Sequence, residues 1–324
     1  MRAFIVAAVL AWIGAPCGDA RAQVPAAGPS LRTPNEHGYI PILEYHLVGT
    51  RDSRWSRSAA RFRRDLELLY ARGYRPITVA QLVDGDIDVP AGLSPVVITF
   101  DDASPGQFRY LDRNGRLEVD PTSAVGIWLD FRREHADWKN RATFCVLSGA
   151  SEGHAFFGDR GIDGQRSAWR FEKLRYLAAQ GFELCAHTLW HANLAKLDDS
   201  AVQEQIARSV LAIDSAVTGY RVRTFALPLG MWPRNRGLAS AGSWRDARSG
   251  RTVTYAFDAI LEVAGRSSPS PASDQFNPRS LPRIQVFENV LEETLDRLDR
   301  DNRRFVSSGS RQRVGKRPPV IKRP

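Results

Sequence analysis

The stretch SPVVITFDD, residues 94–102, decides the fold. After Ser94 and Pro95 it is a continuous run of apolar and β-branched residues, which is typical of a strand buried on both faces of a sheet. The acids Asp101 and Asp102 follow directly. Active sites of α/β folds gather at the carboxyl ends of strands, and two adjacent carboxylates there are costly unless they are paired or bind a metal. The stretch therefore predicts a buried strand that leads into a polar site, with an acidic turn of no function as the alternative.

Strand and helix patterns alternate along the rest of the chain. A strand is expected at 39–45, and a helix at 58–71 has its apolar residues on one stripe. The polar stretch 103–141 interrupts the rhythm, and we interpret it as an insertion that is partly helical. The alternation predicts a parallel sheet, either open or closed. The remaining expected strands are 142–147, 182–186, 224–227, 255–263 and 281–287, and the remaining helices are 167–180, 200–218 and 290–302.

The 324 residues divide into an expected signal peptide, a linker, a catalytic domain and a tail. A basic residue, a short apolar run and the triplet Ala20-Arg21-Ala22 predict a signal peptide over 1–22, so we expect the protein to be exported. The apolar run is short for a membrane span, which needs about 20 residues, and an uncleaved anchor is the alternative. No other segment of the sequence is apolar enough to span a bilayer. The linker is expected at 23–38, the domain at 39–302 and a basic, disordered tail at 303–324.

Two cysteines and the net charge bear on the surroundings of the protein. Cys145 and Cys185 lie in expected strands. If those strands are neighbours, one disulfide is possible in an oxidising compartment; otherwise both are small buried apolar residues.

Much of the formal net charge of +9 comes from the tail, which could contact an anionic envelope polymer. No nucleic-acid recognition motif accompanies the charge, so nucleic acid is not an expected partner.

A second motif, His187-Thr188-Leu189-Trp190-His191, ends another expected strand. Two histidines at i and i+4 face the same way if the segment makes a helical turn, and both imidazoles could then bind one ion. The zinc-peptidase motif of the same spacing needs a glutamate where Thr188 stands, which disfavours a peptidase. With one of the two aspartates, the histidines make a site of two imidazoles and one carboxylate. Such a site leaves positions open for water and substrate.

The two motifs, residues 99–102 and 187–191, resemble in order and spacing the first two motifs of the polysaccharide deacetylases, carbohydrate esterase family four. The segment PILEYH at 41–46 is similar to the branch that includes poly-N-acetylglucosamine deacetylases. FALPLG at 225–230 and LPRI at 281–284 resemble later motifs of the family. The likeness covers most of the expected domain. It implies an α/β fold of a particular kind, a distorted (β/α) barrel with about seven strands rather than the eight of the commonest barrel.

The resemblance also implies a role for each motif residue. Asp101 is expected to be the general base and His46 the general acid. The backbone N–H of Leu229 is expected to stabilise the oxyanion. An arginine that the family often has in the third motif is replaced by Ala226, and Arg283 is expected to orient the base instead. The expected metal ligands are Asp102, His187 and His191.

The implied cofactor is one divalent metal ion, with zinc as the default and iron, nickel, cobalt or manganese as alternatives. The implied partner is an acetylated polysaccharide, an N-acetylglucosamine-containing polymer from which acetyl groups are removed. Trp190 and Trp232 could each stack on a sugar ring, although tryptophan is also a common wall residue.

Two other functions stay open on the sequence. A glycoside hydrolase needs two acids about 5–9.5 Å apart, to which the neighbouring Asp101 and Asp102 are poorly suited, and it leaves the histidines without a role. A non-catalytic carbohydrate-binding protein on the same fold is favoured by the altered third motif and by the insertion. The presence of both aspartates and of His187 and His191 argues against it.

Overall fold

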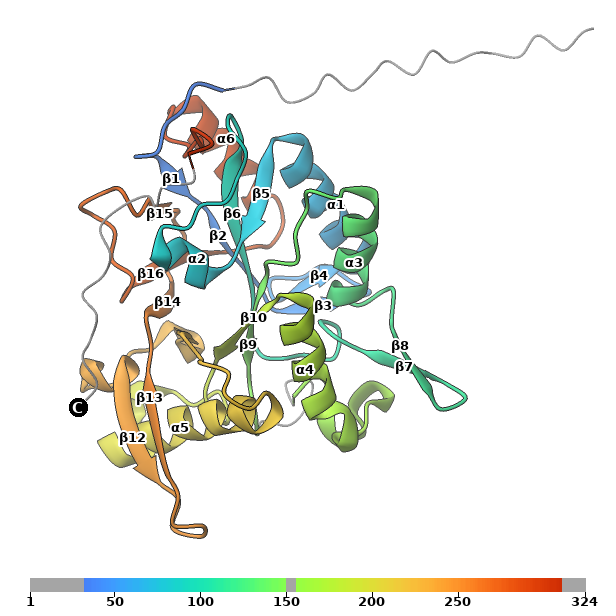
Figure 1. Ribbon diagram of the computed structural model, residues 1–324, viewed down its shortest axis with the longest axis vertical. Helices are drawn as coiled ribbons and strands as arrows, with labels where there is room; N and C mark the ends of the chain where they lie inside the picture. Colours follow the sequence, from blue (N-terminus) through green and yellow to red (C-terminus); the bar gives the residue numbers. More distant parts are fainter. Residues whose placement is uncertain (1–31, 150–155, 311–324) are drawn as a thin grey trace, which may run out of the picture.

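A computed structural model describes residues 32–149 and 156–310, and its centre is a closed barrel of seven parallel strands (Figure 1). The ring closes because β2 pairs with β16 on one side and with β6 on the other. An eighth parallel strand, β5 (Tyr74–Ile77), pairs with the first half of β6, while β9 pairs with its second half. The expected distorted α/β barrel is therefore confirmed. In ring order the strands are β2 (Ile42–Tyr45), β6 (Ser94–Phe100), β9 (Thr143–Val146), β10 (Glu183–Ala186), β11 (Thr224–Ala226), β14 (Ala259–Val263) and β16 (Leu281–Gln285).

The alternation of side chains along the strands separates two apolar clusters. Alternate strand residues such as Ile42 and Val97 belong to the smaller cluster, which fills the barrel interior together with residues of α2 (Val79–Asp84). The intervening residues, such as Leu43 and Ile98, belong to the larger cluster that the surrounding helices share. Both faces of the strands are thus buried, which is why 96–100 is a continuous run of apolar and β-branched residues.

Helices surround the barrel, and polar caps define several of their ends. Ser58, Thr78, Ser123 and Asp198 each accept a hydrogen bond from a backbone N–H of the first turn, as N-cap residues do. The longer helices are α1 (Ala59–Ala71), α3 (Ala124–Glu134), α4 (Arg170–Gln180), α5 (Asp199–Ala216) and α6 (Val290–Arg300). Short 3-10 turns lie at Asp159–Gly164, Ser167–Trp169, Leu194–Lys196, Pro228–Gly230 and Arg236–Ala239.

Small two-stranded sheets lie outside the barrel. The insertion 103–141 contains an antiparallel hairpin followed by α3, so it is partly helical as expected. A second hairpin, β12–β13, packs against α5 (Figure 1). The pairs are β1 (Tyr39–Ile40) with β15 (Ser268–Pro269), β3 (Leu47–Gly49) with β4 (Ser56–Ser58), β7 (Tyr110–Arg113) with β8 (Arg116–Val119), and β12 (Ala241–Arg245) with β13 (Thr252–Ala256).

The single strand expected at 255–263 is wrong. The chain turns at Asp258, because the backbone N–H groups of Asp258 and Ala259 both donate to the carbonyl oxygen of Arg223. The Asp258 carboxylate also accepts a hydrogen bond from the Arg223 guanidinium at 2.6 Å. The turn separates β13, which belongs to the outer hairpin, from β14, which belongs to the barrel. Both pieces contain apolar and β-branched residues, so their composition does not reveal the break.

The folded body continues past residue 302, where the sequence predicts the tail to begin. Arg304 is buried, and its guanidinium donates to Oγ of Ser94 and to the carbonyl oxygen of Arg72, both at 2.6 Å. Phe305 is part of the cluster that fills the barrel interior. Residues 303–310 therefore belong to the fold, which corrects the expected boundary. The expected signal peptide at 1–22, much of the linker and the rest of the tail lie outside the described residues.

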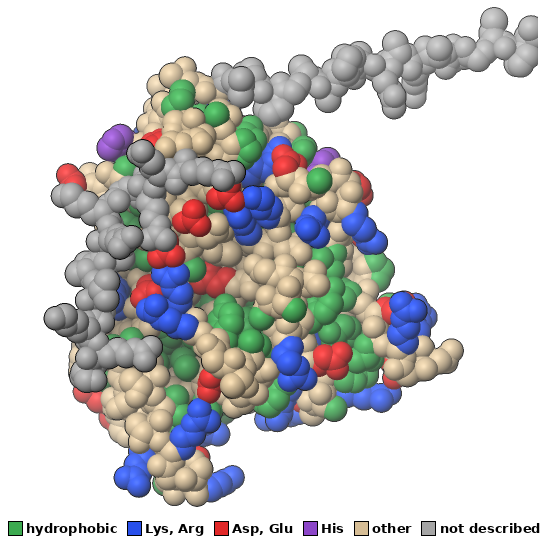
Figure 2. All heavy atoms as spheres, in the orientation of Figure 1, with side chains coloured by type: hydrophobic (Ala, Val, Ile, Leu, Met, Phe, Trp, Pro, Cys, Tyr) green, Lys and Arg blue, Asp and Glu red, His purple; other side chains and the backbone are tan. Residues whose placement is uncertain are grey.

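Charge is mixed on the surface in view. On the face shown in Figure 2, Lys and Arg side chains are interspersed with Asp and Glu side chains. Among the described residues, ion pairs join separate elements, as Arg63 does with Glu134 and Arg223 does with Asp84. Within residues 32–149 and 156–310, no helix has the length and apolar character to cross a membrane.

Candidate active site

The carboxyl ends of the barrel strands bring together residues that the sequence singles out. His46 follows β2, Asp101 and Asp102 follow β6, and His187 follows β10. In a parallel barrel these strand ends all lie on one side. Arg283 reaches the same place from within β16 and bonds to Asp101.

Asp102, His187 and His191 form a group of candidate metal ligands. Nε2 of His187 lies 3.3 Å from Oδ1 of Asp102, and Nε2 of His191 lies 3.4 Å from the same oxygen. A tetrahedral ion with bonds of about 2.0–2.1 Å has its ligand atoms about 3.3–3.4 Å apart, so both separations suit one ion. Nε2 of His187 is also buried and makes no hydrogen bond to any described residue. The three residues therefore fit a divalent metal.

The ring of His187 is fixed by a hydrogen bond on its other side. Its Nδ1 lies 2.9 Å from the carbonyl oxygen of Ala226 in β11, so we infer that Nδ1 carries the proton and donates it. Nε2 then presents a lone pair to the group, which is the tautomer that a metal ligand needs. Burial would lower the pKa of His187, but the carboxylates of Asp101 and Asp102 outweigh burial and raise that pKa above its usual value.

The backbone around the ligands is left-handed at non-glycine residues. The φ angle is 75° at Asp102, 69° at Thr188 and 57° at His191. Such positions cost about 1–3 kcal/mol each and are concentrated at functional sites. The helical turn considered for the two histidines is wrong: the chain bends without a helix, and the N–H of Trp190 donates to Oε1 of Gln205 in α5. The two imidazoles nevertheless converge, with ring centres 5.1 Å apart.

Arg283 binds two buried carboxylates at once. Its Nη1 and Nη2 each donate to one oxygen of Asp101 at 2.7 Å, and Nη2 also lies 2.7 Å from Oε1 of Glu44. Burial alone would raise the pKa of Asp101, but the guanidinium of Arg283 and the ring of His187 outweigh it and hold that pKa below its usual range. Asp101 is therefore ionised at neutral pH. The sequence predicts that Arg283 orients Asp101, and these two hydrogen bonds are the contacts that such a role requires.

Glu44 is a candidate that the sequence analysis did not single out. Its side chain is 1% exposed, and its Oε2 has no hydrogen-bond partner among the described residues. Burial raises the pKa of Glu44 to about 8, with Arg283 opposing the rise and Asp101 adding to it. The burial of Glu44 thus disfavours a second negative charge beside Asp101. A signal was available, because an acid inside the apolar strand 42–45 is costly unless it has a buried partner.

The model of a family described as polysaccharide deacetylase matches residues 132–242 of the chain. The resemblance to the polysaccharide deacetylases is confirmed. The matched range contains His187 and His191, whereas Asp101 and Asp102 lie before it. No curated protein compared with the chain matches it.

Solved structures share the polysaccharide deacetylase fold over most of the chain. The Streptococcus pyogenes deacetylase PplD, in complex with acetate, has a TM-score of 0.54 at 17% identity, and the match covers 82% of this chain and 98% of that one. A polysaccharide deacetylase from Bacillus cereus has a TM-score of 0.54 at 16% identity, covering 80% and 68%. IcaB from Ammonifex degensii has a TM-score of 0.52 at 18% identity, covering 79% and 95%. At these identities the likeness establishes the fold.

His46 lies beside the candidate base on the deacetylase barrel. It belongs to a second group of possible ligand atoms with Glu44 and Asp101, all within 4.8 Å of one another. Its Nε2 is 3.9 Å from Oε1 of Glu44, and its ring packs edge-on against Trp55 with centres 5.0 Å apart. Burial lowers the pKa of His46, with the carboxylates of Asp101 and Asp102 opposing the decrease. The ring is therefore mostly neutral at neutral pH in the free protein.

Leu229 follows β11, the strand next to β10. It lies in the short turn Pro228–Gly230 and has a φ of 57°. Its side chain is 60% exposed and so contributes little to the core. Leu229 is thus at the same end of the deacetylase barrel as the candidate ligands, and its part in binding an oxyanion stays a prediction.

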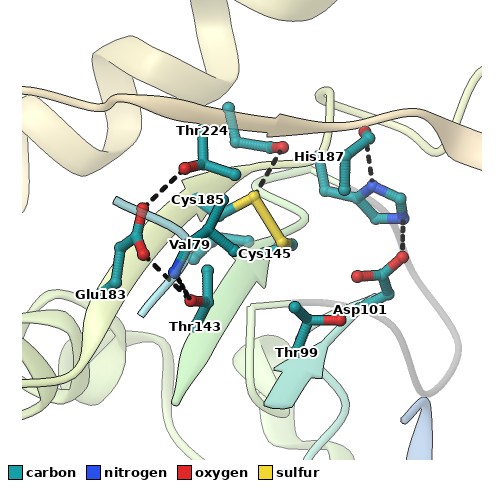
Figure 3. Close-up of a disulfide and its surroundings, with 12 residues drawn as sticks. Val79, Thr99, Asp101, Thr143, Cys145, Glu183, Cys185, His187 and Thr224 are labelled. Carbon is teal, nitrogen blue, oxygen red and sulfur yellow. Dashed lines mark hydrogen bonds and ion pairs between the residues drawn. A yellow bond between two sulfur atoms is a disulfide. The ribbon is translucent and has the colours of Figure 1, made fainter. Parts of the chain in front are cut away.

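Beneath the site, the barrel interior contains a disulfide between Cys145 and Cys185 (Figure 3). The two cysteines are register partners in β9 and β10. The sequence analysis expected a disulfide only if these two strands were neighbours, and they are. His187 lies two residues beyond Cys185, on the same face of the chain. On the other side of the disulfide, buried Glu183 accepts a hydrogen bond from Thr224 at 2.6 Å (Figure 3). The disulfide therefore lies directly under the candidate ligands.

Proposed function

We propose that this protein is a metal-dependent hydrolase that removes acetyl groups from an N-acetylated polysaccharide containing N-acetylglucosamine. One observation carries the proposal: Nε2 of His187 lies 3.8 Å from Oδ2 of Asp101, so an ionised carboxylate stands directly beside the candidate metal ligands. The family match over 132–242 supports an acetylated polysaccharide as the substrate class.

Asp101 would act as the general base. Its carboxylate accepts a proton from the water that attacks the acetyl carbonyl carbon. The two hydrogen bonds from Arg283 hold both carboxylate oxygens and keep the group ionised. A base positioned in this way typically contributes about 10²–10⁴-fold to the rate.

His46 would act as the general acid, and the backbone N–H of Leu229 would bind the oxyanion. When the C–N bond breaks, the amide nitrogen becomes an amine and needs a proton. His46 lies within the small group that also contains Asp101, so proton removal and proton donation occur close together. As an acid, His46 must gain a proton in the substrate complex, because burial lowers its pKa in the free protein. One oxyanion donor is typically worth about 10²–10³ in kcat.

Asp102, His187 and His191 would hold one divalent ion. Such an ion, when bound, polarises the acetyl carbonyl and lowers the pKa of a water molecule. Two imidazoles and one carboxylate suit zinc by default, and iron, nickel, cobalt or manganese also suit them. The hydrogen bond from His187 to Ala226 keeps the imidazole oriented for this purpose.

The two alternative functions fit the site less well. A glycoside hydrolase needs carboxyl groups about 5–9.5 Å apart. Ligand oxygens of Asp101 and Glu44 lie within 4.8 Å of each other, and both carboxyl groups bind Arg283. A non-catalytic protein on this fold would bind metal or glycan and release no acetate.

The deciding experiment is acetate release from N-acetylglucosamine oligomers by the purified chain from residue 23 onward, with zinc or cobalt added and with a chelator. Asp101→Asn removes the base at constant size and should lower release by about 10²–10⁴-fold. Asp296→Asn changes a 55% exposed carboxyl group on α6 and is the matched control. Metal binding without release, or release that Asp101→Asn leaves intact, would overturn the proposal.

We also propose that the protein is exported, with 1–22 as its signal peptide, and that residues 311–324 contact an anionic envelope polymer. The Cys145–Cys185 disulfide supports an oxidising compartment. Recovery outside the cytoplasm of a chain that begins at Gln23 is the expected result. A cytoplasmic chain that still begins at Met1 would contradict it.

A further inference from the structure

Trp190 lies between the two candidate ligand histidines, yet its side chain is 58% exposed. Its backbone is tied to α5 by the hydrogen bond to Gln205. The guanidinium of Arg208, one turn further along α5, lies 6.0 Å from the centre of the Trp190 ring. A large aromatic side chain exposed to this degree adds little to the core and is accessible to a ligand.

Arg208 joins Trp190 to a second tryptophan. Its guanidinium also lies 6.0 Å from the ring centre of Trp244, which comes from β12. Oε1 of Glu204 accepts a hydrogen bond from Nη1 of Arg208 at 2.9 Å, which helps to hold the guanidinium between the two indoles. The three side chains form a row from Trp190, which precedes His191 in the chain, to the hairpin β12–β13, which lies along α5 (Figure 1).

The far end of this row opens into a groove of about 540 Å³ between α5 and the hairpin. Leu211 of α5 and Arg245 and Arg248 of the hairpin line it together with Arg208 and Trp244. Its volume is within the range of about 300–1,000 Å³ that is usual for ligand sites. Indoles beside guanidinium and carboxylate groups suit a sugar, because its C–H face packs on an aromatic ring while its hydroxyl groups bond to the charged groups.

We propose that the row Trp190–Arg208–Trp244 and this groove bind sugars of the substrate chain beyond the sugar that is deacetylated. This inference rests on the proposed function, from which it takes the substrate class. Trp190 precedes His191 in the chain and Trp244 lies on the outer hairpin, so a long sugar chain can contact more of the row than a short one. The protein therefore acts on long N-acetylglucosamine chains in preference to short ones.

The test is the ratio of kcat/KM for the N-acetylglucosamine hexamer to kcat/KM for the dimer. Trp244→Ala and Arg208→Ala should each lower this ratio by roughly fivefold or more, as expected for loss of one aromatic contact. Trp244→Ala could lower the ratio by disturbing the hairpin rather than by removing a sugar contact. Arg208→Ala lies on α5 and leaves the hairpin sequence intact, so a lower ratio in that variant indicates loss of sugar binding. Thr254→Ala changes an exposed residue of β13 that does not line the groove, and it should keep the wild-type ratio. A ratio that neither groove variant changes would overturn the inference.

Binding of the hexamer to the Asp101→Asn protein, measured by calorimetry, separates this inference from the proposed function. Trp244→Ala on that background should weaken hexamer binding by roughly fivefold. If acetate is released but neither the ratio nor the affinity responds to the groove variants, the inference fails and the deacetylase stands. If no acetate is released but hexamer binding depends on Trp244, the groove stands and the deacetylase fails. No hexamer binding at all would overturn the groove.

Discussion

Arg283 donates one hydrogen bond to each carboxylate oxygen of Asp101, both at 2.7 Å, and both side chains are buried. A guanidinium can do this because its donors are fixed in a planar fork that matches a carboxylate. Polysaccharide deacetylases often have an arginine in the third motif where this chain has Ala226. We propose that Arg283 of β16 orients Asp101 in this protein.

Arg283→Lys should shift the acidic limb of the kcat/KM profile to higher pH. A lysine keeps the positive charge but cannot hold both oxygens, so burial raises the pKa of Asp101 towards its usual value. More of the base is then protonated in mild acid, and the lost activity returns as the pH rises. Acetate release between about pH 3 and pH 7 measures the limb, since the usual pKa of an aspartate is about 3.9. Arg116→Lys, at an 82% exposed side chain, is the control. A limb that stays in place would contradict the role of Arg283.

His191→Ala should abolish the thermal stabilisation of the protein by zinc, whereas His46→Ala should retain it. An ion that binds only the folded state stabilises it by about 2.7 kcal/mol at 100 times Kd, which raises Tm by about 5–10 °C for a domain of this size. Differential scanning fluorimetry with and without zinc measures the shift. The comparison is needed because Glu44, His46 and Asp101 form a second possible ligand group. The opposite pattern would assign the ion to that group.

The closure of the barrel could not be predicted from strand patterns alone. A strand buried on both faces has the same apolar run in an open sheet and in a barrel. What decides between them is that β2 pairs with both β6 and β16, and these pairings join segments far apart in the chain. The resemblance to a family supplied the barrel. The break at Asp258 was missed for a related reason, because it depends on the distant Arg223.

The candidate site was more accessible to sequence reasoning than the fold. His187, His191 and the pair Asp101 and Asp102 were found because ligand-type residues follow expected strands at a suitable spacing, and the resemblance to a family chose Asp102 as the ligand. The bend at Thr188 could not be foreseen, since a left-handed non-glycine residue leaves no mark in the pattern of apolar residues. Glu44 was overlooked because the search followed motifs and not misplaced charges within strands.

The pair Cys145–Cys185 should be fully oxidised in the exported protein. Thiol titration in denaturant, followed by mass analysis of the peptides that contain the two cysteines, should find no free thiol at either position. Replacing both with alanine should lower the free energy of unfolding by about 2–4 kcal/mol, as loss of a native disulfide typically does. Urea unfolding of the double variant measures this. A reactive thiol at either position in the native protein, or equal stability of the double variant, would contradict the bridge.

Lys173 in α4 is 1% exposed, and its Nζ donates to the carbonyl oxygen of Phe157 and to Oε1 of Gln165. Burial lowers the pKa of Lys173 to about 7, with Arg109 adding to the decrease and Asp159 opposing it. In the unfolded chain a lysine titrates near about 10.4. Between these two values the unfolded state binds one more proton than the folded state, so this residue makes stability rise with pH.

Lys173→Met should remove that pH dependence. Below about pH 7 the folded wild type must hold a charged ammonium in the core, and above about pH 10 it does not. The free energy of unfolding of the wild type, minus that of the variant, should therefore increase over this interval. The full increase is on the order of 5 kcal/mol. Urea unfolding at intervals from about pH 6 to pH 11 measures it, a range that brackets both lysine pKa values. Lys196→Met, at an exposed lysine, should give a flat difference. A flat difference for Lys173→Met as well would mean that Lys173 stays charged in the folded protein, because only a shifted pKa produces the slope.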